Sequence, residues 1–169
     1  MNEPRDFRGI EWGTSYESLN GMIIYDQGMD GKLKYCTRAN DEKKMGNAIS
    51  EGLVYSFFDN RFYEVQVVLR SWTNNQILLE YLVPMLGNTY SFYETKNHKM
   101  YLWDGNDIVV CCVYNKPSDA TGLIYTFKQI ESEIKESGSA PLEEMIKRRD
   151  IVMLEYFEDK TDHKINDML

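Results

Sequence analysis

The sequence contains no long hydrophobic run. Its longest apolar stretches, residues 82–86, 108–113 and 151–154, are much shorter than the ~20 residues that a helix needs to cross a bilayer, so we expect no transmembrane span. Basic residues are in the minority, with 19 Lys and Arg against 27 Asp and Glu and a formal net charge of −8. Nucleic acids and anionic membranes are bound through clustered cations. The charge therefore argues against both as partners.

Cysteine is scarce, with Cys36, Cys111 and Cys112 as the three residues. Their number is odd and no C-x-x-C spacing occurs, so neither a disulfide framework nor a zinc site is expected. We predict three free thiols, although a bridge from Cys36 to Cys111 or Cys112 stays open. The first residues are charged and no apolar segment follows them, so no secretory signal is expected. Read as it stands the chain is cytoplasmic, and removal of a leader would instead place it in the periplasm or cell envelope.

Residues for catalysis are few as well. The two histidines, His98 and His163, lie in stretches expected to be exposed, and no phosphate-binding loop is present. We therefore predict no catalytic residue, no metal and no cofactor, which inclines the interpretation away from an enzyme. The least weak candidates for a small enzyme that uses carboxylates and a phenol are Asp104, Asp107 and Tyr114.

Several stretches predict β-strands. Aromatic and β-branched residues between positions 53 and 69 flank Asp59-Asn60, which indicates a hairpin. A second hairpin is expected from residues 21–25 and 32–37, where Asp30-Gly31 suits a tight turn. A short strand is expected over residues 7–12. It is followed by one helical turn that begins with a capping box at Thr14 to Glu17.

A helix is predicted over residues 73–86. Its apolar residues recur at spacings of three and four: Ile77, Leu78, Tyr81, Leu82 and Met85. Thr73 is the expected N-cap, and Gly87 the expected end. Further strands are predicted at 90–95, 100–103, 108–114 and 123–127. Because residues 108–114 are apolar on both alternating faces, we expect that strand in the centre of the sheet.

The charged sequence after Lys128 predicts a helical extension. Three pairs stand in the favourable i,i+4 order: Glu131 with Lys135, Glu143 with Lys147, and Glu144 with Arg148. Pro141 can start a second helix. The apolar stripe of that helix is Leu142, Met145, Ile146, Val152, Met153, Tyr156 and Phe157. It needs cover either from the sheet of the same chain or from a second copy, so a homodimer through the C-terminal helix stays open.

Together these elements predict an α+β fold. A mostly antiparallel sheet of six to eight strands has one face covered by the helix at 73–86, because runs of strands around a single helix favour this arrangement over βαβ repeats. We expect residues 1–127 to form the sheet domain and residues 128–169 to form the helical C-terminal extension.

Aromatic residues are abundant, at 13% of the chain. One helix cannot cover all of them on such a sheet, so we expect part of them to form a face that binds a protein partner or a small apolar ligand. The residues predicted for this ligand- or partner-binding role are Tyr55, Phe58, Phe62, Tyr93 and Trp103.

A resemblance rests on the opening and on the aromatic hairpin. The motifs are Phe7-Arg8-Gly9-Ile10-Glu11-Trp12-Gly13-Thr14, Gly21-Met22, Leu53-Val54-Tyr55-Ser56-Phe57-Phe58 and Phe62-Tyr63-Glu64-Val65. Over residues 7–127 the chain resembles a family of uncharacterised bacterial proteins, many of them exported. The resemblance implies a bacterial, exported protein, and it carries no catalytic residue and no activity.

Three functions follow, in order of preference. The first is a non-catalytic binding or interaction module of the bacterial envelope, suggested by surplus aromatic residues and missing catalytic signatures. The second is an acidic inhibitor or immunity-type protein that masks a basic partner, because long-range attraction would speed their encounter. The third is a small enzyme that would use the carboxylates of Asp104 and Asp107 and the phenol of Tyr114.

Overall fold

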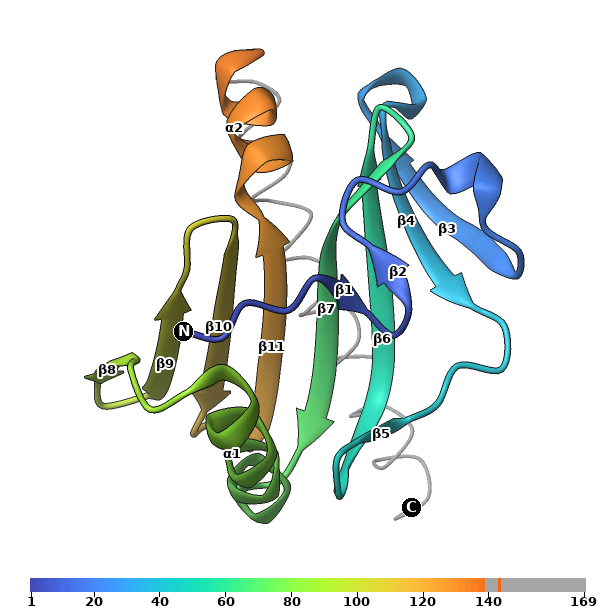
Figure 1. The fold of residues 1–169 in the computed structure, drawn as a ribbon. Coiled ribbons are helices and arrows are strands. Elements are labelled where there is room, and N and C mark those ends of the chain that lie inside the picture. The colour runs from blue at the N-terminus through green and yellow to red at the C-terminus, as the bar shows by residue number, and fades with distance from the viewer. Residues whose placement is uncertain (139–142, 144–169) are drawn as a thin grey trace.

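The computed structural model describes residues 1–138 and residue 143 (Figure 1). The elements in chain order are β1 (Asp6–Phe7), β2 (Ile10–Glu11), η1 (Tyr16–Ser18), β3 (Met22–Gly28), η2 (Met29–Gly31), β4 (Leu33–Arg38), β5 (Lys44–Met45), β6 (Ala48–Phe58), β7 (Arg61–Arg70), α1 (Trp72–Leu86), β8 (Ser91–Glu94), β9 (His98–Asp104), β10 (Ile108–Asn115), β11 (Ala120–Phe127) and α2 (Lys128–Glu136). The predicted α+β class, with a mostly antiparallel sheet, is confirmed.

The main sheet consists of two four-stranded meanders, and each is followed by a helix. Its strand order is β3-β4-β6-β7-β11-β10-β9-β8, and β5 pairs with β6 beside this path. The meander β3-β4-β6-β7 leads into α1, and the meander β8-β9-β10-β11 leads into α2. Their last strands, β7 and β11, pair antiparallel, with Val67 opposite Leu123. Strand β10 has neighbours on both sides as predicted, but the centre belongs to β7 and β11, because each meander contributes its final strand to the join.

The two helices cover opposite faces of the sheet. Helix α1 packs Leu78, Leu82 and Leu86 into the cluster that contains Leu53 and Tyr55 of β6. Helix α2 packs Ile130 and Ile134 into the cluster that contains Val54. Because successive side chains of a strand point to opposite faces, Val54 lies on the other side of the sheet from its two neighbours. Figure 1 shows α1 and the N-terminal strands in front of the sheet.

The chain begins with a small hairpin where the sequence predicted one strand. Strands β1 and β2 pair antiparallel, with Phe7 opposite Ile10. Arg8 and Gly9 form the turn between them with positive φ angles of 52° and 78°, and this turn divides the predicted strand over residues 7–12. Asp59 and Asn60 also have positive φ angles, and the hairpin predicted around them is confirmed by the β6–β7 pair.

Two helix starts differ from their predictions. The N-cap of α1 is Ser71, whose Oγ accepts a hydrogen bond from the Asn74 backbone N–H at 3.2 Å, and not Thr73. The helical turn η1 follows Ser15, which makes no side-chain capping bond, so the predicted capping box at Thr14 does not form. Gly87 ends α1 as predicted, with a φ angle of 98°.

The beginning of the predicted C-terminal extension is helical. Lys135 Nζ lies 3.1 Å from Glu131 Oε2 in α2, which confirms that i,i+4 pair. The two other predicted pairs, the apolar stripe from Leu142 to Phe157 and the proposed dimer contact lie outside the described residues. All three cysteines are free thiols, as predicted. No helix in residues 1–138 has the length and hydropathy required to cross a membrane.

Candidate functional site

The structure buries four of the five aromatic side chains that the sequence predicted for binding. Tyr55, Phe62 and Trp103 are fully buried and Phe58 is 4% exposed, whereas Tyr93 is 51% exposed. A partner on the outside of the folded chain therefore reaches only Tyr93 among them. The role predicted for the set stays a prediction.

Besides helix α1, the N-terminal segment and helix α2 also cover the sheet, and together these coverings explain the burial. Trp12 of the N-terminal segment stacks on Phe62, with 4.9 Å between ring centroids. Phe7 meets Tyr55 edge-on at 6.0 Å. Trp103 of β9 packs against the C-terminal end of α1, and its indole N–H donates a hydrogen bond to the Gly87 carbonyl at 2.9 Å. Phe58 belongs to the cluster under α2.

Exposed aromatic side chains gather instead on strand β8 and the residue before it. Tyr90, Phe92 and Tyr93 are 38%, 46% and 51% exposed, and we call these three residues the aromatic edge. All four residues of β8 are exposed. The sequence carried one signal for this, because the strand is short and its two adjacent aromatic residues stand between Ser91 and Glu94, but that pattern does not show which edge of the sheet it forms.

A groove lies along helix α1 and is bounded on the side of the sheet by Tyr101. It measures about 500 Å³. Its lining residues are Trp72, Gln76, Leu79, Glu80, Val83, Pro84 and Tyr101. Tyr101 connects the two features, because its ring lies 4.9 Å from Phe92 and 5.7 Å from Tyr90. The Lys99 ammonium lies 4.4 Å from the centroid of Trp72, so one end of the groove combines an aromatic surface with a positive charge.

Ion pairs hold the far end of β8 in place. Glu94 Oε1 lies 2.8 Å from Lys116 Nζ and 3.9 Å from Lys99 Nζ. The hydrogen bond from Lys116 lowers the pKa of the Glu94 carboxyl below its ordinary value, so this carboxylate is ionised at neutral pH. These contacts fix the strand against β9 and leave its outer side open.

Strand β8 is an edge strand in the described part of the chain. It pairs antiparallel with β9 alone, with Phe92 opposite Tyr101. The outward N–H and C=O groups of an edge strand can pair with an added strand. The side chains of Phe92 and Tyr93, which extend above and below the plane of the sheet, point to its opposite faces. An added strand at β8 would therefore find an aromatic contact on each face.

The three residues considered for catalysis are not all brought together: Asp104 and Asp107 lie at the same β9–β10 turn, but Tyr114 does not. Asp104 pairs with Lys128, and the Tyr114 hydroxyl donates to Asp119 Oδ1 at 2.7 Å. Asp107 directly precedes β10 and Tyr114 is its second-last residue, so the two are about 20 Å apart along an extended strand. The small-enzyme interpretation therefore loses the three residues on which it depended.

No group of three His, Cys, Asp or Glu side chains in residues 1–138 is arranged to hold a metal ion. Compared with known protein families, curated proteins and solved structures, the chain has no match. The resemblance of residues 7–127 to exported bacterial proteins stays a prediction.

Proposed function

We propose that this chain is a non-catalytic binding module that takes up an extended segment of a protein partner along strand β8. The observation that carries the proposal is the exposure of Phe92 and Tyr93 on edge strand β8, and of Tyr90 just before it, beside an open groove. Large exposed apolar patches mark protein interaction sites, and here three of four consecutive residues are exposed aromatic side chains. Strand addition to a sheet edge is a recurrent mode of peptide recognition.

The groove supplies the side-chain contacts that the backbone alone would lack. Main-chain hydrogen bonds give affinity in strand addition, and pockets for alternate side chains give specificity. A peptide paired with β8 would place alternate side chains toward Tyr101 and the groove along α1. The lining is mainly apolar, so we propose that these partner side chains are apolar or aromatic.

The proposal also includes the cellular location of this protein and the sign of the charge on its partner. The resemblance to exported bacterial proteins favours the cell envelope. The net charge of −8 favours a basic partner, since opposite charges speed association. An acidic inhibitor or immunity-type protein is the alternative within this proposal. The two functions differ in their salt dependence: binding of a basic partner mainly through charge would weaken strongly as the salt concentration rises.

Site-specific photo-crosslinking tests the proposed surface. A photoreactive amino acid at position 93 should crosslink one defined protein in cells. The same amino acid at Ile23, which is 55% exposed on the opposite edge strand β3, should not crosslink that protein.

Once the partner is identified, its affinity tests the same surface. Phe92→Ser combined with Tyr93→Ser should weaken binding by more than tenfold, since aromatic anchors dominate interface energies. Ile23→Ser is the matched control and should change the affinity by less than threefold. Equal crosslinking from both positions, or an unchanged affinity in the double variant, would refute the proposal.

A further inference from the structure

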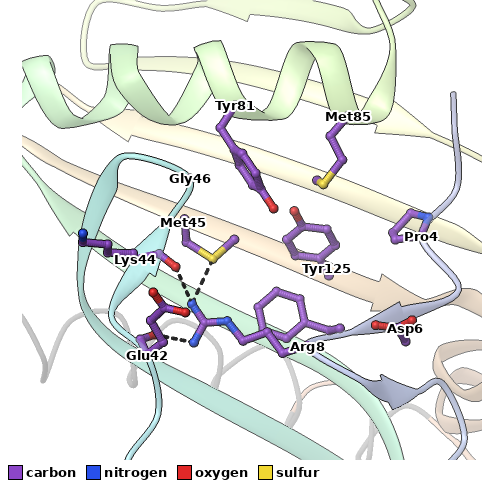
Figure 2. Close-up of a pocket in the computed structure, with 11 residues that line it drawn as sticks. Pro4, Asp6, Arg8, Glu42, Lys44, Met45, Gly46, Tyr81, Met85 and Tyr125 are labelled. Carbon is purple, nitrogen blue, oxygen red and sulfur yellow. Dashed lines mark hydrogen bonds between the residues drawn. The ribbon is translucent and has the colours of Figure 1, made fainter.

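A second concave site lies on the opposite side of α1 from the groove, under the N-terminal hairpin. It is a cavity of about 440 Å³, shown in Figure 2. Four separate segments line it: the first hairpin, the β5–β6 turn with the residues before it, helix α1, and strand β11. A volume in this range suits a small molecule.

The walls of the cavity are tied to one another. The Arg8 guanidinium donates to Asp41 Oδ1 and to the Lys44 carbonyl, both at 2.7 Å. It also donates to the Glu42 carbonyl. On the other side, the Asn2 backbone N–H donates to the Leu86 carbonyl at 2.7 Å. The hairpin is thus fastened to the β5 segment and to the end of α1, so the cavity is formed before any ligand binds.

Two tyrosine hydroxyl groups point into this cavity. Tyr81 reaches in from α1 and Tyr125 from β11, and their hydroxyl groups face one another (Figure 2). Tyr125 is 2% exposed and Tyr81 is 36% exposed, so the lining runs from the solvent to the sheet. The Tyr125 hydroxyl makes no hydrogen bond with a protein group in the described part of the chain. Its oxygen is not one of the fully buried polar atoms without a partner, so it is open to the cavity and can bond to an occupant.

The remaining lining determines what that occupant can be. Phe7, Met45 and Met85 are apolar walls. The charged lining residues balance in sign, since Asp6 and Glu42 stand against Arg8 and Lys44. The Arg8 charge is moreover compensated by Asp41, which leaves Asp6 and Glu42 against Lys44 alone, so the lining disfavours an anionic ligand. Burial raises the pKa of Tyr125, so its phenol remains protonated at neutral pH and can donate a hydrogen bond.

We propose that this cavity binds a small uncharged molecule with an apolar body and a carbonyl oxygen, and that this oxygen accepts hydrogen bonds from Tyr125 and Tyr81. The apolar body lies against Phe7, Met45 and Met85. The site is separate from the aromatic edge and does not depend on the protein-binding function proposed for it.

Three probes that share one apolar body test the ligand class. They are 4-phenylbutan-2-one, butylbenzene, which lacks the oxygen, and 4-phenylbutanoate, which adds a charge. Titration of the isotope-labelled full chain, followed by backbone amide NMR shifts, should show the ketone binding most tightly. The shifting residues should include Gly46, Tyr81 and Met85. If butylbenzene or 4-phenylbutanoate binds as tightly as the ketone, or if the lining residues do not shift at millimolar ketone because the cavity holds water only, the proposal is wrong.

Conservative variants test the hydrogen bonds. Tyr125→Phe and Tyr81→Phe remove only the hydroxyl groups, and each should raise the Kd for the ketone about three- to tenfold. The Kd for butylbenzene should not rise. Tyr93→Phe removes an exposed phenol on the aromatic edge and is the matched control, with the Kd for the ketone unchanged. Met85→Trp fills the cavity and should abolish binding. An unchanged Kd in Tyr125→Phe, or ketone binding that survives in Met85→Trp, contradicts the proposal.

Discussion

Arg8 and Asp41 form an ion pair in which Nη1 and Oδ1 are 2.7 Å apart, and both side chains are largely buried. The other carboxylate oxygen of Asp41 accepts a hydrogen bond from the Tyr55 hydroxyl at 2.7 Å. Tyr55 belongs to the core of the sheet. One carboxylate therefore joins the N-terminal hairpin, the segment before β5 and the sheet beneath them.

Replacement of Asp41 should destabilise the chain measurably. In Asp41→Ala the Arg8 charge loses its counterion and the buried Tyr55 hydroxyl loses its acceptor. Because a buried polar group without a partner is costly, we expect a loss of about 2–3 kcal/mol in the free energy of unfolding. Urea denaturation measures it. Asp107→Asn is the control, since Asp107 is exposed, and it should change the free energy by less than about 0.5 kcal/mol. A loss as small as that in Asp41→Ala would show that the network contributes little.

Gly46 is the position where a side chain is least tolerable in the β5–β6 turn. Its φ angle is +60°, and an added Cβ would lie 2.6 Å from the Tyr81 ring. Gly46→Ala should therefore lower the free energy of unfolding by about 2–3 kcal/mol, part from the left-handed backbone and part from the clash. Gly9→Ala is a matched control, because Gly9 has a φ angle of +78° and no atom lies within 4 Å of its Cβ position. It should show only the backbone part, about 1 kcal/mol. Equal losses in the two variants would mean that Tyr81 moves aside freely.

Glu3 fastens the chain's beginning to the β9–β10 turn and should make stability depend on acid pH. Its carboxylate accepts hydrogen bonds from the backbone N–H groups of Asn106, Asp107 and Ile108 at 2.6, 2.7 and 3.0 Å. Burial opposes ionisation, but these bonds outweigh it and lower the pKa of Glu3 below its ordinary value of 4.5. A carboxyl whose pKa is lower in the folded state stabilises the fold above the unfolded pKa, and this stabilisation is lost as the pH falls through the folded pKa.

Glu3→Gln should accordingly lose up to about 1 kcal/mol at pH 7. The difference from the unmodified chain should shrink as the pH falls below 4.5. Thermal unfolding across pH 3 to 7 measures this dependence. Glu17→Gln, at an exposed carboxylate, should follow the unmodified chain at every pH. A Glu3→Gln difference that does not change with pH would mean that the charge of Glu3 is not what stabilises the turn.

Local signals in the sequence predicted those parts of the fold that depend on neighbouring residues. Asp59 and Asn60 tolerate positive φ angles between two β-rich runs, so the hairpin around them could be recognised. The periodicity of residues 73–86 predicted α1 in the same way. The turn at Arg8 and Gly9 could not be recognised, because Arg has no preference for the positive φ angle that it adopts here.

The candidate sites depend on contacts between distant segments, which periodicity does not show. Tyr125 lies in a β-rich run like any core aromatic, and only the fold brings the hairpin, the β5–β6 turn and α1 over its hydroxyl. Tyr55 and Phe62 were predicted to be exposed because one covering helix was counted. The N-terminal hairpin adds a second cover through Phe7 and Trp12. Tyr93 remained exposed because its strand lies at the edge of the sheet.

Thiol reactivity should report on the two sheet faces separately. Burial raises the pKa of Cys36 to about 11 and that of Cys112 to about 12, whereas Cys111 is only partly buried. The thiolate is the reactive form, so at pH 8 iodoacetamide should modify Cys111 first.

In Cys111→Ser the two remaining thiols should react only as fast as the chain unfolds, and urea should accelerate their modification in step with the unfolded population. Mass spectrometry resolves the sites. Since both thiols hold their protons more tightly when folded, the free energy of unfolding should also fall as the pH rises above about 9. Rapid modification of Cys112 in the native Cys111→Ser chain would show that the side of the sheet under α1 opens without unfolding.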